Sequence, residues 1–210
     1  MNEPDHAPST DATPAPGGPS EPRVTYGDGV PDDVELGLLG DVTGRRVIEL
    51  GISDNAVALA RLGAKAIVLD PDEDAIGRLR VDAADAEVPV ECHIGDLADL
   101  GFAPSGTIDM AVSVHTLDMV DDLGRILRQV HRVLKAGAPF VIVLDHPFAF
   151  VGLSDDGALH RYGDDRRTIG DLLAALDRSN FRVETLHEVG ITADTGSPTK
   201  LVAKVRKLGS

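Results

Sequence analysis

Three carboxylates could form one ligand-binding site, because each follows a short apolar run at a spacing typical of neighbouring strands. Glu49 lies in "VIELG", Asp70 ends "AIVLD" about 20 residues later, and Asp96 follows "ECHI" in "GDLADL". Open α/β sheets bind ligands outside the carboxyl ends of their parallel strands, so these acids are expected at one edge. An acid after the second strand accepts hydrogen bonds from both ribose hydroxyls and disfavours a 2′-phosphate, which argues against NADP.

The turn between the first strand and the next helix has an unusual composition. "GISDNA" supplies only Gly51, whereas a dinucleotide-binding loop has three glycines that let the backbone approach the pyrophosphate. Ordinary NAD binding is therefore poorly supported. Asp54 and Asn55 tolerate left-handed backbone angles, so a tight turn is still expected. The Asp54 carboxylate is expected to cap the N–H groups of the following helix and to repel a second anion there.

Two histidines follow later strands of the same predicted edge. "SVHTLD" places His115 after the fourth strand, and "LDHPF" places Asp145 and His146 at the end of the fifth. An imidazole titrates near neutrality, so His146 or His115 could act as a general base for an acceptor that must lose a proton. The alternative is structural: His146 orders the turn before Pro147, and His115 caps a loop.

A metal site is not expected at this edge. The residue types of His115, Asp118, Asp145 and His146 suit a metal ion, but the sequence contains no compact ligand motif such as H-E-x-x-H.

The elements that would position these residues alternate regularly from Arg46 onward, as in βαβ units. Strands are expected at Val47–Leu50, Ala66–Asp70, Val90–Ile94, Met110–Val114, Phe140–Leu144, Arg182–Glu188 and Leu201–Arg206. Helices are expected at Asn55–Leu62, Glu73–Asp85, Leu123–Leu134 and Ile169–Arg178. The first five strands are apolar on both faces, which favours a parallel sheet covered by helices. The stretch 190–200 has no helical pattern, so the last strand is expected to be antiparallel.

Length and composition predict one folded domain over residues 23–210. The chain has 210 residues, of which 42% are hydrophobic, enough for one sizeable core. Residues 1–22 contain no Val, Ile, Leu or aromatic residue and are expected to be a disordered tail. Just before the first strand, a short helix is expected around Val34, Leu36, Leu38 and Leu39. Tyr26 is expected to pack against the core, or alternatively to close over a ligand.

Charge and targeting signals restrict the partners. The net charge of −15 disfavours nucleic acid and anionic membrane surfaces. No apolar run approaches the roughly 20 residues that span a bilayer, and the N-terminus lacks the order of a secretory signal. The single cysteine, Cys92, excludes an intrachain disulfide framework. A cytoplasmic location is expected, and the oligomeric state is left open.

From about Tyr26 to the C-terminus, the chain resembles the class I S-adenosylmethionine-dependent methyltransferases of small-molecule type. The matching stretches are "VIELG", "NAVALARLGAKAIVLDPD", "GDLADLGF" and "IDMAVSVHTLDMVDDLGRILRQVHRVLKAGAPFVIVLDHPF". The resemblance implies a Rossmann-like α/β fold, in which an open, mostly parallel seven-stranded sheet has helices on both faces and an antiparallel last strand. It also implies S-adenosylmethionine as the cofactor and a small-molecule methyl acceptor.

The resemblance also assigns roles to residues. Glu49 would organise the first loop and face the methionine amino group, Asp70 would hold the ribose, and Asp96 with Leu97 would meet the adenine. Ser113 and His115 would line the methionine and sulfonium end. The complete predicted cofactor set is Glu49, Gly51, Ser53, Asn55, Asp70, Pro71, Asp96, Leu97 and Ser113. Two of these acids have a structural alternative. Asp70 could stabilise the turn before Pro71, and Asp96 could cap a helix that begins in "LADL".

The segment after the fifth strand often overhangs the acceptor pocket in this fold. In "HRYGDDRRTIGDLLAALDRSNF" it is polar and mixed in charge, and Tyr162, Arg166 and Arg167 are therefore candidate acceptor contacts. A loop of solvated charges is the alternative.

The first loop departs from the family pattern, which is acid-x-Gly-x-Gly-x-Gly. Here the loop is about two residues short, which removes about 6 to 7 Å of extended chain. Two functions follow. One is a methyltransferase acting on an unknown small molecule, and the other is a non-catalytic protein of the same fold whose shortened loop has lost or altered cofactor binding. A nicotinamide-dependent oxidoreductase would need the absent glycines.

Overall fold

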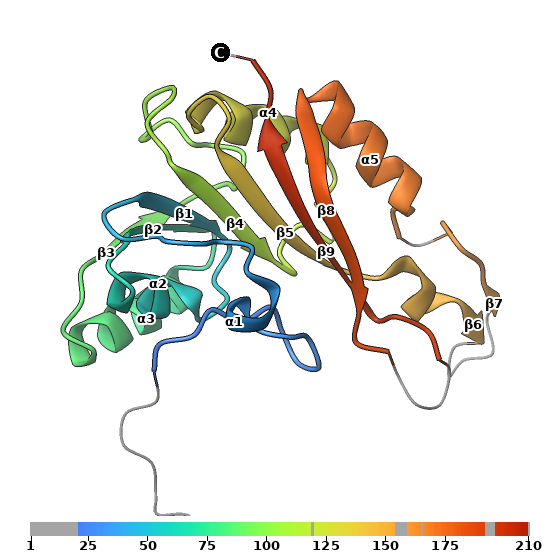
Figure 1. Cartoon of the computed structure of the whole chain (residues 1–210), viewed down its shortest axis with the longest axis horizontal. Coiled ribbons are helices and arrows are strands. Elements are labelled where there is room, and N and C mark those ends of the chain that lie inside the picture. Colours follow the sequence, from blue (N-terminus) through green and yellow to red (C-terminus); the bar gives the residue numbers. More distant parts are fainter. Residues whose placement is uncertain (1–20, 119, 154–158, 165, 192–195, 210) are drawn as a thin grey trace, which may run out of the picture.

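The computed structural model describes residues 21–118, 120–153, 159–164, 166–191 and 196–209 (Figure 1). All but the last two residues of the predicted tail therefore lie outside the described part. Within that part, no helix combines the length and apolar character that crossing a membrane requires.

The central sheet has seven strands in the order β3-β2-β1-β4-β5-β9-β8. Their bounds are β1 Arg46–Leu50, β2 Lys65–Asp70, β3 Val90–Ile94, β4 Met110–Val114, β5 Pro139–Asp145, β8 Phe181–Val189 and β9 Lys200–Lys207. The first five strands pair in parallel, and β9 pairs antiparallel with both β5 and β8. Six strands thus share one direction, and the predicted mostly parallel sheet with an antiparallel last strand is confirmed.

Four main helices connect the strands: α2 Asn55–Arg61, α3 Glu73–Asp85, α4 Leu123–Val133 and α5 Ile169–Arg178. Each begins at the residue expected from the sequence. Three of them have a side-chain cap, namely Asp72 for α3, Asp122 for α4 and Thr168 for α5. Such caps satisfy N–H groups that would otherwise lack a partner, at about 1 kcal/mol each.

Helices cover both faces of the sheet, so its strands are apolar on each side. Ile48 and Ile142 face α4 and α5, where Leu127 and Leu176 pack against them. Val47, Met110 and Val112 face the opposite way, toward α2 and the N-terminal segment that carries Tyr26. Figure 1 shows α4 and α5 on one side and α1, α2 and α3 on the other. Burying each such side chain contributes roughly 1.5–3 kcal/mol.

The short helix expected before the first strand is present as α1, Asp33–Leu36, and ends at Gly37 with a left-handed φ of 61°. Leu38 and Leu39 are buried beyond its end, whereas Val34 is exposed. Tyr26 is fully buried, and its hydroxyl donates to Asp33 Oδ1 at 2.7 Å, in agreement with the core alternative.

After β5 the chain forms a 3-10 helix, Pro147–Phe150, and two short strands, β6 Gly152–Leu153 and β7 Leu159–His160. The two strands pair with each other and not with the central sheet. This hairpin was not predicted, because two-residue strands have no detectable periodicity.

Candidate functional site

The turn after β1 is closed over by the loop after β4. Gly51 has φ +80°, and a Cβ placed on it would lie 1.9 Å from Thr116 Oγ1. Only glycine therefore fits here, both for its backbone angle and for the closeness of Thr116. The Gly51 N–H donates to Leu69 O at 2.9 Å, and the Ile52 N–H donates to Asp70 Oδ2 at 2.9 Å. These bonds draw the shortened turn toward β2.

Asp54 precedes α2 with a left-handed backbone, φ 60° and ψ 3°, as its residue type allowed. Its side chain makes no capping hydrogen bond, so the prediction that it caps this helix is wrong. The reason lies in the backbone, because a capping side chain reaches back to the helix N–H groups from an extended conformation. At φ 60° the Asp54 carboxylate is not directed that way.

Glu49 is a buried carboxyl group beneath this turn. It is 1% exposed, Ser53 Oγ donates to its Oε1, and its Oε2 has no hydrogen-bond partner among the described residues. Burial raises the pKa of Glu49 to about 7, an effect that the bond from Ser53 offsets only in part. Glu49 therefore holds its proton close to neutral pH.

Asn55 ties the N-terminal segment to the start of α2. Its Oδ1 accepts from the Thr25 N–H at 2.9 Å, and its Nδ2 donates to Thr25 O at 2.8 Å. Nδ2 also donates to Ser53 Oγ at 3.0 Å. The predicted cofactor contacts Ser53 and Asn55 thus already bond within the chain.

Asp70 ends β2 with both carboxylate oxygens at the sheet edge. Oδ2 accepts from Ile52 N–H, and Oδ1 accepts from Asp72 N–H at 2.7 Å. The turn role is therefore present, and Pro71 is exposed beside it. A carboxylate offers about four acceptor positions, so each oxygen can take one more hydrogen bond.

The predicted adenine contacts Asp96 and Leu97, and Ser113 from the predicted methionine end, are engaged elsewhere. Asp96 Oδ1 accepts from Ala98 N–H at 2.8 Å, and its Oδ2 lies 3.2 Å from Arg125 Nη1. Leu97 is buried in the core. Ser113 is fully buried and donates to Leu50 O at 3.1 Å, which joins β4 to the end of β1.

Two cavities flank the turn. One of about 520 Å³ lies between the N-terminal segment and the end of β4, lined by Thr25, Gly27, Asp28, Gly29, Val30, Ile52, Ser53, Asp54, Val114 and His115. Another cavity of about 460 Å³ extends from Asp70 along α3. The charged residues in its lining are one arginine, Arg78, and four aspartates: Asp54, Asp70, Asp72 and Asp82. Asp28 and Asp54 line the first cavity without a lysine or arginine, and aspartates are the majority of the charged residues of the second, which favours a cationic ligand over an anionic one.

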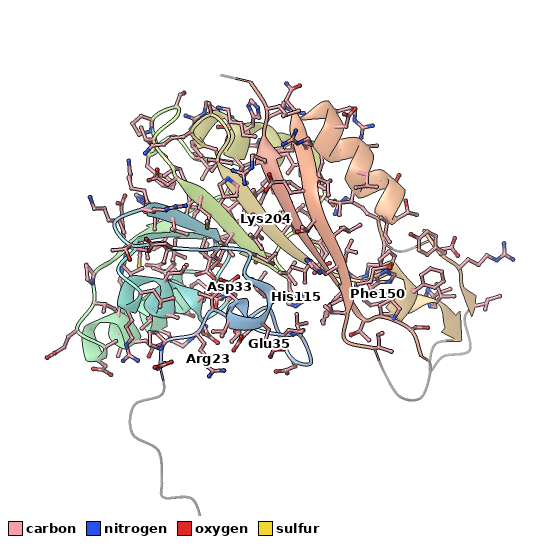
Figure 2. The ribbon with its side chains drawn as sticks, viewed as in Figure 1. Arg23, Asp33, Glu35, His115, Phe150 and Lys204 are labelled. Atoms are coloured by element: carbon pink, nitrogen blue, oxygen red, sulfur yellow. The ribbon has the colours of Figure 1, made fainter. Side chains whose placement is uncertain are left out.

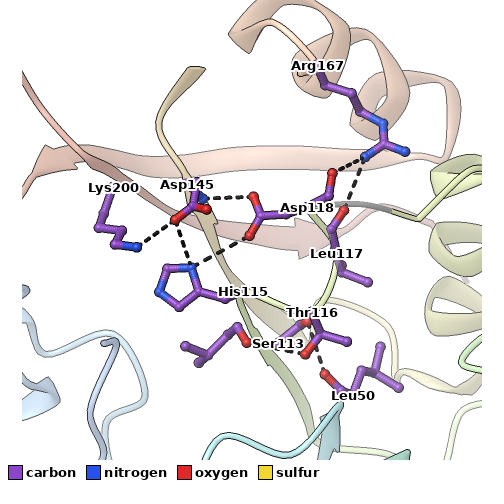
Figure 3. A network of polar contacts seen from close by, with 10 residues as sticks. Leu50, Ser113, His115, Thr116, Leu117, Asp118, Asp145, Arg167 and Lys200 are labelled. Atoms are coloured by element: carbon purple, nitrogen blue, oxygen red, sulfur yellow. Dashed lines mark hydrogen bonds and ion pairs between the residues drawn. The ribbon is translucent and has the colours of Figure 1, made fainter. Parts of the chain in front are cut away.

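His115, labelled in Figure 2, follows the end of β4. It borders the first cavity and has a left-handed conformation with φ 57°. Its Nδ1 lies 3.6 Å from Asp118 Oδ2 and 3.5 Å from Asp145 Oδ1, and Lys200 Nζ lies 2.5 Å from the same Asp145 oxygen (Figure 3). A Cβ on Gly27 would lie 2.7 Å from His115 Nε2, so the N-terminal segment covers that nitrogen.

His146 does not join this group. It is fully buried, its Nε2 lies 2.9 Å from Glu188 Oε1, and its Nδ1 accepts from Phe148 N–H at 3.2 Å. Both ring nitrogens therefore help to order the turn before Pro147. Of the two predicted general bases, only His115 borders a described cavity.

The candidate acceptor contacts after β5 have structural partners. Arg167 donates to Leu117 O at 3.1 Å and to Asp118 O at 3.2 Å, and Tyr162 Oη accepts from Ile169 N–H at 3.1 Å. Arg166 lies over the Phe150 ring, 4.1 Å from its centroid. These residues order the segment that follows β5.

Comparison with known proteins adds to this geometry. The family model described as a methyltransferase domain matches residues 49–142. The crystal structure of an S-adenosylmethionine-dependent methyltransferase from Mesorhizobium loti aligns with a TM-score of 0.69 and 24% identity, over 83% of this chain and 96% of that one. Residues 49–142 therefore resemble the methyltransferase domain family in sequence, and the chain as a whole has the Rossmann-like fold of the class I methyltransferases. Members of this methyltransferase family use S-adenosylmethionine as their cofactor.

The curated methyltransferase relatives are distant. Ajmaline N-methyltransferase from Rauvolfia serpentina is 27% identical over 99 residues, which are 46% of this chain and 33% of the relative. Norajmaline N-methyltransferase from the same plant is 28% identical over 99 residues, 46% of this chain and 34% of the relative. The chain thus spans about a third of the length of these relatives.

The same methyltransferase fold also occurs in the cyclase SpnF, whose structure aligns with a TM-score of 0.67 and 17% identity, over 85% of this chain and 80% of that one. Fold alone therefore does not determine the reaction.

Proposed function

We propose that this protein transfers a methyl group from S-adenosylmethionine to a small-molecule acceptor at the carboxyl edge of β1, β2 and β4. The cavity of about 520 Å³ between the N-terminal segment and His115, whose lining includes Asp28 and Asp54, carries this proposal. Its volume lies in the range of small-molecule sites. Asp28 and Asp54 in its wall suit a ligand that carries a sulfonium and an ammonium group.

The residues at the turn fit this cofactor at Asp70, whereas Glu49 lies behind them. Asp70 retains acceptor capacity on both oxygens at the end of β2, where ribose hydroxyls would donate to it. Glu49 presents a buried carboxyl oxygen without a hydrogen-bond partner in the described chain, and Ser53 separates it from the cavity. We assign Glu49 to shaping the turn, through the hydrogen bond that it accepts from Ser53. Thr116, packed against Gly51, must shift if the methionyl group extends over that glycine.

When bound, S-adenosylmethionine supplies an electrophilic methyl group on sulfur. The chain would contribute position and exclusion of water, which can supply much of the rate of such a displacement. The N-terminal segment is fixed by Asn55 and covers the cavity from one side. His115 and Val114 bound the same cavity at the end of β4, where an acceptor would approach the methyl group.

A specific observation also supports the second candidate, a non-catalytic protein of this fold. Ser53, Asn55 and Ser113, all predicted to contact the cofactor, make hydrogen bonds within the chain. Thr116 fills the space over Gly51. Together with the shortened turn, these contacts satisfy the polar groups and fill the space that a ligand would otherwise occupy.

Calorimetric titration of the full chain with S-adenosylmethionine and S-adenosylhomocysteine separates the two candidates. The proposal expects saturable binding with micromolar dissociation constants for both compounds. Asp70→Asn should weaken binding at least about tenfold, while the exposed Asp74→Asn on α3 serves as the matched control and leaves it unchanged. An absence of binding heat and of any thermal shift would favour the non-catalytic protein.

A further inference from the structure

We propose that His115, Asp118 and Asp145 bind a divalent transition-metal ion, through His115 Nδ1 and one oxygen of each carboxylate. One ligand atom from each of the three residues lies within 4.8 Å of the other two. His115 and Asp118 come from the loop after β4, and Asp145 is the last residue of β5 (Figure 3). Because β4 and β5 are parallel neighbours, their carboxyl ends bring the three side chains together.

Buried polar atoms without partners point to an ion at this place. The Asp118 side chain is 10% exposed, and its Oδ2 has no hydrogen-bond partner among the residues described. The same holds for His115 Nδ1, which faces that oxygen. Leaving such atoms unpaired costs about 1–3 kcal/mol each, and an unplaced ion is one of the ordinary explanations.

The separations fit coordination better than hydrogen bonding. His115 Nδ1 lies 3.6 Å from Asp118 Oδ2 and 3.5 Å from Asp145 Oδ1, both beyond the 2.7–3.2 Å of an N–H···O bond. Ligands about 2.0–2.2 Å from one central ion are separated by distances of this size. The surroundings hold the ligands in place: the Asp145 N–H donates to Asp118 Oδ1 at 2.8 Å, and Arg167 donates to the carbonyls of Leu117 and Asp118.

The donor set selects the kind of ion. One imidazole nitrogen and two carboxylate oxygens suit Zn²⁺ and Mn²⁺, whereas Mg²⁺ and Ca²⁺ prefer oxygen alone. Three protein ligands leave at least one position open, as in catalytic zinc sites. His115 borders the cavity of about 520 Å³. Asp118 and Asp145 instead line a small cavity with Leu144 and Arg167, so the ion would sit behind His115 and we assign it no step in the proposed methyl transfer.

Lys200 is the competing cation. Its Nζ lies 2.5 Å from Asp145 Oδ1 and neutralises part of the site's negative charge. Its side chain is long and 23% exposed, so it can move away when an ion binds. A neutral residue at this position should therefore strengthen metal binding. With Nδ1 on the ion, the neutral imidazole keeps its proton on Nε2, and His115 acts as a ligand and not as the predicted general base.

Titration of the chelator-treated full chain with ZnCl2 by calorimetry, and with MnCl2 by electron paramagnetic resonance, tests the site. One ion per chain is expected, and the tighter of the two metals identifies the preference. Asp118→Asn should weaken binding at least about 100-fold, whereas Asp121→Asn, an exposed neighbour, should leave it within about twofold. Lys200→Gln should tighten binding about tenfold.

The result that overturns the proposal is an absence of saturable binding by the wild-type chain and by Lys200→Gln. Binding that Asp118→Asn and His115→Gln leave unchanged would also overturn it, because the ion would then sit elsewhere, for example on His6. If Asp118→Asn does not fold, the comparison of Lys200→Gln with wild type decides the question. Cofactor titrations are made separately, so that a failure of methyl-donor binding is distinguishable from a failure of metal binding.

Discussion

Replacing Glu49 by glutamine should make the protein more stable at alkaline pH and little different at acid pH. The pKa of about 7 for this buried carboxyl stands above the ordinary value of 4.5, because burial disfavours the charged form. The folded state therefore keeps the proton to a higher pH than the unfolded chain. Its unfolding free energy falls as pH rises from about 4.5 to about 7.

The magnitude follows from the difference between the two pKa values, since each pKa unit corresponds to about 1.4 kcal/mol. For the fully buried Glu49 the loss reaches about 3 kcal/mol above pH 7. A glutamine is neutral throughout, can still accept from Ser53 Oγ, and should remove this loss.

Urea unfolding of wild type and Glu49→Gln at pH 5, 6, 7 and 8 measures the effect. The difference in unfolding free energy should grow in favour of the variant by about 2.5 kcal/mol from pH 5 to pH 8, since a smaller part of the loss has already occurred at pH 5. Glu73→Gln, at an exposed site on α3, serves as the control and should show no such trend. Parallel pH profiles for wild type and Glu49→Gln, or a variant less stable than wild type at pH 8, would refute the reasoning.

Three further predictions concern the turn and its ligand. Asp70→Ala should weaken S-adenosylmethionine binding by about 1–3 kcal/mol in calorimetry, and an unchanged dissociation constant would remove Asp70 from the site. Two glycines inserted after Ile52 should raise the affinity if loop length limits binding, whereas equal or weaker binding would mean that the native turn is adapted to its ligand. Gly51→Ala should lower the unfolding free energy by about 1–3 kcal/mol, since φ is +80° and Thr116 leaves no room for a Cβ. In the double variant, Thr116→Ala should restore part of the unfolding free energy that Gly51→Ala removes, as measured by thermal unfolding. If none of it is restored, the strain lies in the backbone alone.

Much of the fold was predictable because its signals are local. Apolar runs such as Val47–Leu50 gave strands that agree with the structure to within a residue or two at their ends. The non-helical stretch between residues 190 and 200 correctly indicated the antiparallel β9. The hairpin of β6 and β7 was missed, because strands of two residues carry no periodic pattern.

The site was less predictable because its contacts depend on register and burial. The pairing of β5 with β9 places Asp145 opposite Lys200, and no local pattern specifies that register. The Thr116 contact with Gly51 likewise joins two loops that are far apart in sequence. The sequence predicted that His115 and Asp145 lie at the carboxyl edge of the parallel strands. It could not indicate that both would lie within 3.6 Å of one another while His146 pairs with Glu188.

A crystal structure of the full chain with S-adenosylhomocysteine tests the central claim most directly. The account predicts the ligand across the carboxyl edge of β1, β2 and β4, with its ribose hydroxyls on Asp70, its sulfur end beside His115, and Thr116 moved away from Gly51. A saturated crystal in which residues 51–55 and Thr116 keep their present contacts, and in which the carboxyl edge carries no density for the ligand, would contradict it.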